Sequence, residues 1–274
     1  MLSFKINETM RIIRKAKKES GNIPIILNFS GGKDSLLLLN LVKKVTDDFI
    51  CFYCVTKIEF PETVESVKET AKELEIPLLF SYPNDHKGSF FKRLKQFRYF
   101  PLIKNTWCSR DLKWRPQKKV LMRFFGNKTF YKLNAVRKYE SVRRTHIYHK
   151  NNVFFWKDYD VSKDLMVFPI LNWTTNERDN YLLKNKIKIR TNPLYKKYKV
   201  SGCYWCPFYQ ASIYRRILSD FPNLYDKVID WEIRLNKPSV SGKKWLRDLK
   251  DEMVHIKRLD HFLYDSEKLE KLEG

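Results

Sequence analysis

The sequence predicts an α/β fold, in which helices flank a parallel sheet and a helical C-terminal region follows. Three observations support this prediction. Short apolar runs alternate with segments of helical periodicity. A Ser-Gly-Gly turn joins the first apolar run to an apolar helix, as in the first half of a βαβ unit. After residue 208, apolar residues recur at helical spacing, broken at Pro222 and Pro238.

The first elements set the pattern for the rest. Residues 4–20 are expected to form a surface helix that ends at Gly21, and residues 23–29 a strand buried on both faces. Residues 34–45 follow as a helix that is apolar on nearly every side. The later elements are predicted in this order: a strand at 49–55, a helix at 61–75, a strand at 77–81, helices within 87–126 around a loop at 101–108, and strands at 129–136, 152–156 and 166–170.

Thr174-Thr175-Asn176-Glu177 has the Thr-x-x-Glu form of a capping box, which predicts that a helix begins there. We therefore expect an α/β domain at residues 1–208 and a helical region at residues 209–274. With 43% hydrophobic and 31% charged residues, the chain is too apolar to be disordered and too polar for an integral membrane protein.

The longest apolar stretch, residues 36–42, falls far short of the roughly 20 residues that span a bilayer. The N-terminus lacks the features of a signal peptide, so a cytoplasmic protein without a membrane partner is expected. In that compartment the five cysteines stay reduced and are candidate ligands or nucleophiles.

The net charge of +23 is concentrated in the middle of the chain. Residues 101–200 hold 24 basic and 7 acidic side chains, against 17 and 12 before them and 13 and 12 after them. Such a field attracts a polyanion, so we expect RNA or DNA to bind there. The alternative is the lysine-rich composition typical of AT-rich genomes. The candidate contacts are Lys118, Lys119, Arg123, Lys128, Lys132, Lys184, Lys186, Lys188, Lys196 and Lys197.

The motif Ser30-Gly31-Gly32-Lys33-Asp34-Ser35 lies between the first strand and its helix, where backbone N–H groups and the helix dipole can hold a phosphate. The glycines allow a close approach of the backbone, the serines add hydroxyl donors, and Lys33 adds charge. The motif is too short for a Walker A loop, and Asp34 follows the lysine. A phosphate-binding turn is therefore predicted, with an ordinary structural turn as the alternative.

Ser-Gly-Gly-x-Asp-Ser is the signature of the PP-loop ATP pyrophosphatases, and further motifs resemble the phosphoadenosine phosphosulfate reductase-like branch of that superfamily. They cover about residues 22–208 in family order. These motifs are Phe60-Pro61-Glu62-Thr63, Trp107 to Lys113 with Pro116, Val136-Arg137 with Glu140-Ser141 and Arg143-Arg144, Pro169 to Thr174, and Asn192 to Tyr195 before Gly202-Cys203-x-x-Cys206-Pro207.

The resemblance implies an adenine nucleotide alpha hydrolase-like, Rossmann-like fold that holds ATP and Mg²⁺ at the carboxyl ends of the strands. It implies that the Ser30 to Ser35 motif, with Gly31 and Gly32, binds the nucleotide. Arg137, Arg143 and Arg144 would face the anionic substrate, and Lys113 would lie near the loop. The implied catalytic residues are Lys33, Asp34, Lys113 and Arg137.

Two positions depart from the family pattern. Val55-Thr56-Lys57 stands where Asp-Thr-Gly is usual, and the 68 residues after Cys206 contain no cysteine, whereas assimilatory reductases use a nucleophilic cysteine in a C-terminal tail. Reduction of a sulfonucleotide is therefore the alternative activity, and not the expected one.

The resemblance also implies that Cys108, Cys203 and Cys206 converge beside the loop and bind a [4Fe-4S] cluster with one open iron, as in PP-loop tRNA thiolases. Thiolates suit zinc as well, with a histidine as a fourth ligand. Cys51 and Cys54 are expected on opposite faces of a strand as buried free thiols. The alternative for Cys54, near the carboxyl end of that strand, is a role as fourth ligand or sulfur carrier. The histidines His86, His146, His149, His255 and His261 match no metal-binding signature.

These features together predict an enzyme that adenylates a nucleic-acid group with ATP and replaces its oxygen by sulfur from a sulfur donor. The non-enzymatic alternative is a zinc-stapled module that binds nucleic acid without turnover.

Overall fold

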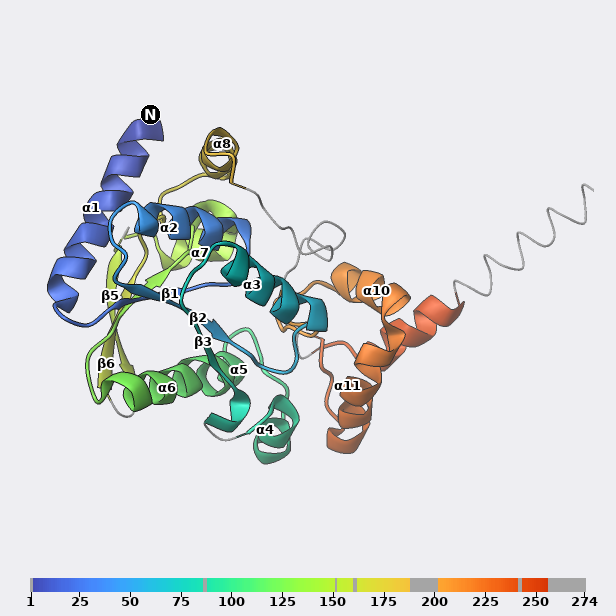
Figure 1. Ribbon diagram of the computed structural model, residues 1–274. Helices are drawn as coiled ribbons and strands as arrows, with labels where there is room; N and C mark the ends of the chain where they lie inside the picture. The colour runs from blue at the N-terminus through green and yellow to red at the C-terminus, as the bar shows by residue number, and fades with distance from the viewer. Residues whose placement is uncertain are drawn as a thin grey trace, which may run out of the picture.

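A six-stranded sheet forms the centre of the computed structural model, which describes residues 2–85, 88–150, 152–159, 162–187, 202–240 and 243–255. The strand order is β3-β2-β1-β4-β6-β5 (Figure 1). Five strands are parallel, as predicted, whereas the edge strand β5 runs antiparallel to β6. The strands are β1 (Ile25–Asn28), β2 (Phe49–Cys54), β3 (Leu78–Ser81), β4 (Tyr131–Asn134), β5 (Phe154–Tyr159) and β6 (Ser162–Val167).

Helices cover both faces of this sheet, which confirms the Rossmann-like α/β class (Figure 1). Helices α1, α2 and α8 lie on one side, and α6 lies on the other. A π-helical turn, Arg110–Trp114, leads into α6. The helices are α1 (Leu2–Ser20), α2 (Lys33–Lys43), α3 (Pro61–Glu73), α4 (Phe90–Phe97), α5 (Trp107–Ser109), α6 (Arg115–Phe125), α7 (Val142–Ile147), α8 (Thr175–Lys184), α10 (Ala211–Asp220), α11 (Pro222–Leu235) and one at 246–255.

The apolar strands are buried on both faces because their side chains alternate between two cores. Ile25 and Leu27 pack with α1 and α2, while Ile26 packs with Val120 and Leu121 of α6. In β2, Cys51 belongs to the first core and Cys54 lies against the second. The two cysteines therefore face opposite sides of the sheet, as predicted.

The predicted capping box starts α8. The Thr174 hydroxyl accepts a hydrogen bond from the Glu177 backbone N–H at 3.2 Å, and the Glu177 carboxylate accepts one from the Thr174 N–H at 2.8 Å. Tyr181 then donates to Asn40 Oδ1 of α2 at 2.6 Å. The box thus fixes the first turn of α8, and Tyr181 joins the second half of this helix to the C-terminal half of α2.

The C-terminal helices share a separate apolar core with α4, α5 and the cysteine segment (Figure 1). Its aromatic members include Phe90, Trp107 and Trp205. The fully buried Glu232 carboxylate accepts backbone N–H groups of Ser239 at 2.9 Å and Leu246 at 2.8 Å, so it caps the helix at 246–255. The helical C-terminal region is confirmed, and the boundary at residue 208 stays a prediction. Within the described residues, no helix is long and apolar enough to cross a membrane.

Candidate active site

The strand order reverses at β1, whose two neighbours are β2 and β4. In open α/β sheets, ligands bind at such a switch point, outside the carboxyl ends of the strands. The Ser30–Ser35 loop leaves β1 at this point. Gly31 has a φ of +72°, and a Cβ atom there would lie 3.1 Å from Val67 Cγ2. Its conformation therefore favours glycine at residue 31, and the close approach of Val67 adds to this preference.

Hydrogen bonds within the loop hold its two serines together. Ser35 donates to the Gly32 carbonyl at 2.8 Å, and the Ser30 hydroxyl lies 3.3 Å from Ser35 Oγ. The loop borders a hollow of about 190 Å³, here called the loop hollow, which Lys33, Arg144 and Arg178 also line. Asp34 and Glu140 line it too, and they form ion pairs with Arg178 and Arg144. The helix N-terminus and the three cations are groups that can hold a phosphate.

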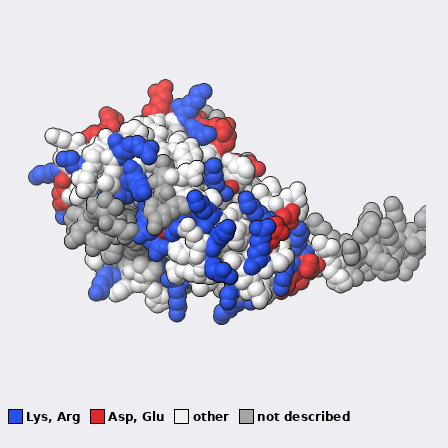
Figure 2. Space-filling model, turned by 90° about the horizontal axis from the view of Figure 1, so that it is seen from below, with Lys and Arg blue, Asp and Glu red and all other residues white. Residues whose placement is uncertain are grey.

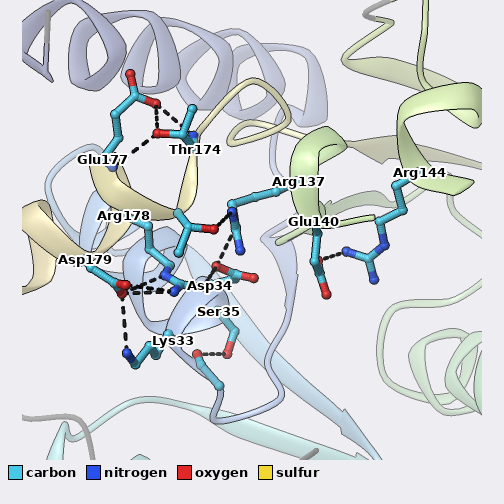
Figure 3. A network of polar contacts seen from close by, with 12 residues as sticks. Lys33, Asp34, Ser35, Arg137, Glu140, Arg144, Thr174, Glu177, Arg178 and Asp179 are labelled. Carbon is cyan, nitrogen blue, oxygen red and sulfur yellow. Dashed lines mark hydrogen bonds and ion pairs between the residues drawn. The ribbon is translucent and has the colours of Figure 1, made fainter. Parts of the chain in front are cut away.

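Asp34 joins the loop to two distant arginines (Figure 3). Its Oδ1 accepts Arg137 Nε at 2.7 Å and Arg178 Nη1 at 3.0 Å. Arg137 is 3% exposed and also donates to Thr175 Oγ1 at 3.2 Å. Burial lowers the pKa of Arg178, but its bonds with Asp34 and Asp179 outweigh burial and raise that pKa overall. Two of the predicted catalytic residues, Asp34 and Arg137, thus lie in contact, and their catalytic roles stay a prediction.

Arg178 and Asp179 are site residues that the sequence reasoning missed. Asp179 Oδ1 lies 3.4 Å from Lys33 Nζ and 3.0 Å from Arg178 Nε (Figure 3). The capping box at Thr174 was the available signal. It places residues 175–179 in the first helical turn after a strand, at the edge where ligands bind.

The two arginines of the Arg143-Arg144 segment lie in different places. Arg144 lines the loop hollow and forms an ion pair with Glu140 (Figure 3). The Arg143 guanidinium lies over the Phe208 ring, 4.5 Å from its centroid. Arg144 is therefore the member of the pair that borders the loop.

A second hollow of about 250 Å³ adjoins the first, because Ser30 lines both. Cys54, Cys203 and Lys113 are among its walls, and we call it the thiol hollow. Cys203 enters this wall through a β-bridge with Glu59. Residues of the loop and of the cysteine motif, which are far apart in the sequence, thus line neighbouring hollows.

The departure at Val55-Thr56-Lys57 has a structural counterpart. Lys57 takes the left-handed conformation, with φ of 59°, at the position where the family pattern has glycine. The nearby carboxylate is Glu59, which accepts the Thr56 N–H at 2.8 Å and the Thr56 hydroxyl at 2.6 Å. Thr56 Oγ1 lies 3.8 Å from Cys203 Sγ. Glu59 therefore orients Thr56 next to a predicted ligand.

Lys113 lies on the π-helical turn, a feature often found at functional sites. Asp111 anchors this turn. It is fully buried and binds Arg93, Arg110 and Arg115. Burial lowers the pKa of Lys113, but negative charge at four thiols outweighs burial and raises that pKa. These thiols are Cys203, Cys54, Cys108 and Cys206.

The pKa values of the cysteines reflect the same interaction with Lys113. Burial raises the pKa of Cys108 to about 11 and that of Cys206 to about 12, while Lys113 lowers both. Of these thiols, Cys54 and Cys203 line the same hollow as Lys113, and thiols are suitable donors for an iron–sulfur cluster or zinc. In the described part of the chain, no three His, Cys, Asp or Glu side chains are arranged to hold a metal ion.

Two of the charges predicted to bind nucleic acid are buried, so that prediction is wrong for them. Lys118 is 2% exposed and Lys132 is fully buried, and their Nζ atoms lie 3.0 Å and 2.8 Å from the Asp164 carboxylate. A buried charge needs a partner, and Asp164 serves both lysines.

Exposed candidates remain for a nucleic-acid surface. They are Lys119, Arg123, Lys128, Lys184 and Lys186. Blue side chains spread over the middle of the face on which α6 lies (Figure 2). Lys188, Lys196, Lys197 and the Asn192 to Tyr195 motif lie outside the described residues.

Comparisons with known proteins agree with this fold. Two uncharacterized proteins of Methanocaldococcus jannaschii are each 28% identical to the chain, over 81% and 82% of its length. The chain spans about half the length of these relatives, 51% and 44%. The fold resembles that of the U34-tRNA thiolase NcsA of Methanococcus maripaludis with its [4Fe-4S] cluster. That match has a TM-score of 0.50 and 17% identity, and covers 88% of this chain and 83% of the thiolase.

Residues 24–209 match the phosphoadenosine phosphosulfate reductase domain, which is more than half of the sequence. The match includes the Ser30–Ser35 loop, the Arg137 segment and the cysteines around Lys113. The chain therefore belongs to the phosphoadenosine phosphosulfate reductase domain family of the PP-loop, adenine nucleotide alpha hydrolase-like superfamily.

Proposed function

We propose that this protein is an ATP-dependent sulfurtransferase that thiolates a base of RNA or DNA. One observation carries the proposal: the Ser30–Ser35 loop lines one hollow, Cys54, Cys203 and Lys113 line a second, and Ser30 borders both. An enzyme that activates an oxygen with ATP and then replaces it by sulfur needs its nucleotide site and its sulfur site next to each other.

The first step is adenylation of the target carbonyl. The base oxygen attacks the α-phosphorus of ATP, the bond to the β-phosphate breaks, and pyrophosphate leaves. The backbone N–H groups of Gly31 and Gly32 and the Lys33 ammonium would hold the phosphates, with Mg²⁺ neutralising their charge. Asp34 holds Arg137 and Arg178 beside the loop. Arg178, which lines the loop hollow, would face the charge that develops on the leaving group.

The second step is displacement. A sulfide donor adds to the activated carbon, and AMP leaves with the original oxygen, so no net oxidation or reduction occurs. Cys108, Cys203 and Cys206 would hold a [4Fe-4S] cluster, which supplies an iron that binds sulfide. Lys113, which lines the thiol hollow with Cys54 and Cys203, would balance the negative charge of thiolates that bind the cluster. Zinc on the same thiols is the alternative, and would favour a module that binds nucleic acid without turnover.

The exposed cations support a polynucleotide substrate. Lys119, Arg123 and Lys128 lie on α6 or just after it, within the basic middle of the chain. The tRNA substrate and cluster of the Methanococcus maripaludis thiolase support the same proposal. The second candidate is a sulfonucleotide reductase, which the cation-rich loop hollow and the family also favour.

Pyrophosphate release tests the first step. The double variant Lys33→Ala, Asp34→Ala should lose ATP-dependent pyrophosphate release in the presence of bulk tRNA. The matched control, Lys43→Ala with Asp47→Ala, removes the same charges from the other end of α2 and should behave as wild type. Wild-type release by the first variant would contradict the proposal that the loop binds the ATP phosphates. Tighter binding of a sulfonucleotide than of ATP would favour the reductase.

Metal content tests the thiol site. Protein purified anaerobically should contain iron and acid-labile sulfide in near-equal amounts. Cys108→Ser, Cys203→Ser and Cys206→Ser should each lower the iron content, whereas Cys51→Ala, on the opposite face of β2, should not. Stoichiometric zinc without iron would contradict the cluster.

A further inference from the structure

A third hollow of about 550 Å³ adjoins the thiol hollow, because Trp114 and Asn134 line both. Its walls come from the ends of β4 and β6 and from the segment after Arg137. We infer that this hollow, here called the base hollow, receives one unpaired nucleobase of a polynucleotide. The inference rests on the proposed function and names the part of the substrate that enters the site.

Aromatic and apolar side chains form the walls of the base hollow. The Tyr148 and Phe168 rings pack edge to face, with centroids 5.2 Å apart, and Trp114 forms the border with the thiol hollow. The aliphatic walls are Val136, Ile147 and Met166. Flat aromatic surfaces are what a base that has left its stack requires, because stacking replaces the contacts that it loses.

Polar groups are few and are fixed in position. Gln117 donates to Asn28 at 2.5 Å, Asn28 donates to Asn134 Oδ1 at 2.6 Å, and Asn134 donates to the Lys132 carbonyl at 2.9 Å. This chain of amides fixes Asn134 between the two hollows and leaves one lone pair of its Oδ1 to accept a hydrogen bond. His149 adds a further polar group, with Nδ1 2.8 Å from the His146 carbonyl. A few fixed polar groups in an apolar cavity are typical of a site that reads the edge of a ring.

The charge beside the hollow indicates that the base belongs to a polynucleotide. Residues 138–150 carry the basic side chains Lys138, Arg143, Arg144 and Lys150 and one acidic side chain, Glu140. A free apolar ligand forms no ion pairs with these side chains, whereas the phosphates on either side of an everted base can. A base in this hollow lies next to the thiol hollow, where the proposed sulfur transfer takes place.

Binding of single-stranded RNA tests the inference. The probes are a labelled 12-nucleotide RNA of mixed sequence and the same backbone with abasic residues, at fixed salt. The intact RNA should bind on the order of tenfold tighter. Tyr148→Ala should remove this difference, and Tyr148→Phe should retain it. The control Phe4→Ala changes an exposed ring on α1, outside the base hollow, and should bind both probes as wild type does.

Equal binding of both probes by wild type, or an unchanged preference in Tyr148→Ala, would overturn the inference. So would a nucleoside monophosphate that binds as tightly as the intact RNA. A measurement on the wild-type chain covers the case in which Tyr148→Ala fails to fold. RNA containing 4-thiouridine should photocrosslink to Trp114, Tyr148 or Phe168, and crosslinks confined to other residues would contradict the base hollow. Pyrophosphate release is scored separately, so failure of the base hollow and failure of adenylation are distinguishable.

Discussion

Three aspartates pair with part of the basic charge in the middle of the chain. Each carboxylate binds two or more cations, and at least two of those cations are buried or half-buried in every case. The pairs join Asp34 to Arg137 and Arg178, Asp111 to Arg93, Arg110 and Arg115, and Asp164 to Lys118 and Lys132. Part of the charge that the sequence suggests for a nucleic-acid surface therefore stabilises the fold and the loop instead.

Asp111→Asn should destabilise the protein strongly. The variant leaves the guanidinium groups of Arg93, Arg110 and Arg115 without their buried counter-ion, which costs about 3 kcal/mol of the free energy of unfolding. Urea unfolding followed by circular dichroism measures the loss. Asp248→Asn, an exposed carboxylate 3.7 Å from Arg247, is the control and should change stability by less than about 0.5 kcal/mol. Equal effects of the two variants would contradict the anchoring role.

The stabilisation by Asp111 should also depend on pH. Burial raises the pKa of this carboxyl, but the hydrogen bonds and charges of Arg110 and Arg93 outweigh burial and hold the pKa below its ordinary value of 3.8. A depressed folded-state pKa stabilises the protein above the ordinary value, and the effect is lost as the pH falls through the folded-state value. The difference in stability between wild type and Asp111→Asn should therefore be constant above about pH 5 and shrink in more acidic solution.

At the scale of the loop between β1 and α2, the two glycines should differ in what they tolerate. Gly31→Ala places a Cβ atom at a φ of +72° and 3.1 Å from Val67 Cγ2, so it should lower stability by about 1–2 kcal/mol. Gly32→Ala is the matched control. Its φ is −78°, and its Cβ atom would lie 3.5 Å from Ser30 Oγ, an ordinary contact.

Thermal unfolding without nucleotide measures both variants. A lower melting temperature is expected for Gly31→Ala alone. Equal losses in both variants would show that the left-handed conformation of residue 31 is not the cause of the destabilisation. Gly31→Ala should also weaken ATP binding, because the strained loop no longer holds its N–H groups in place.

At the scale of the whole molecule, the exposed cations of α6 should govern how polynucleotide binding responds to salt. Each phosphate contact adds about −0.7 for single strands to the slope of log affinity against log salt. Replacing Lys119, Arg123 and Lys128 by alanine should therefore make that slope about 2 shallower, with ATP binding unchanged. Titrations of single-stranded RNA between low and moderate salt measure it.

The matched control removes three exposed lysines from the near-neutral C-terminal region, Lys237, Lys243 and Lys244. It should leave the slope unchanged. If both triple variants change the slope equally, the α6 face is not a specific contact surface, and the lysine-rich composition explains the charge.

The strands and helices follow from local pattern, and the sequence predicts them well. The continuous apolar run of β1, the glycine turn at Gly31 and the capping box at Thr174 each depend on residues a few positions apart. The ends of the strands are not encoded in the same local way. The apolar run at 166–170 continues past β6, which ends at Val167, because the residues after the strand are buried as well. The antiparallel direction of β5 has no comparable local signal in the sequence.

By itself, the sequence determined the α/β class, the Ser30–Ser35 loop and the identity of the thiols, because each is written in neighbouring residues or in short motifs. Only the tertiary structure decided which charges meet. Asp179 contacts Lys33 of the loop from 146 positions away in the sequence. Lys118 binds Asp164 from 46 positions away, and Lys132 binds the same carboxylate from the neighbouring strand. A lysine's hydropathy is the same in either setting, so no local pattern distinguishes an exposed cation from one that a distant carboxylate holds inside the fold.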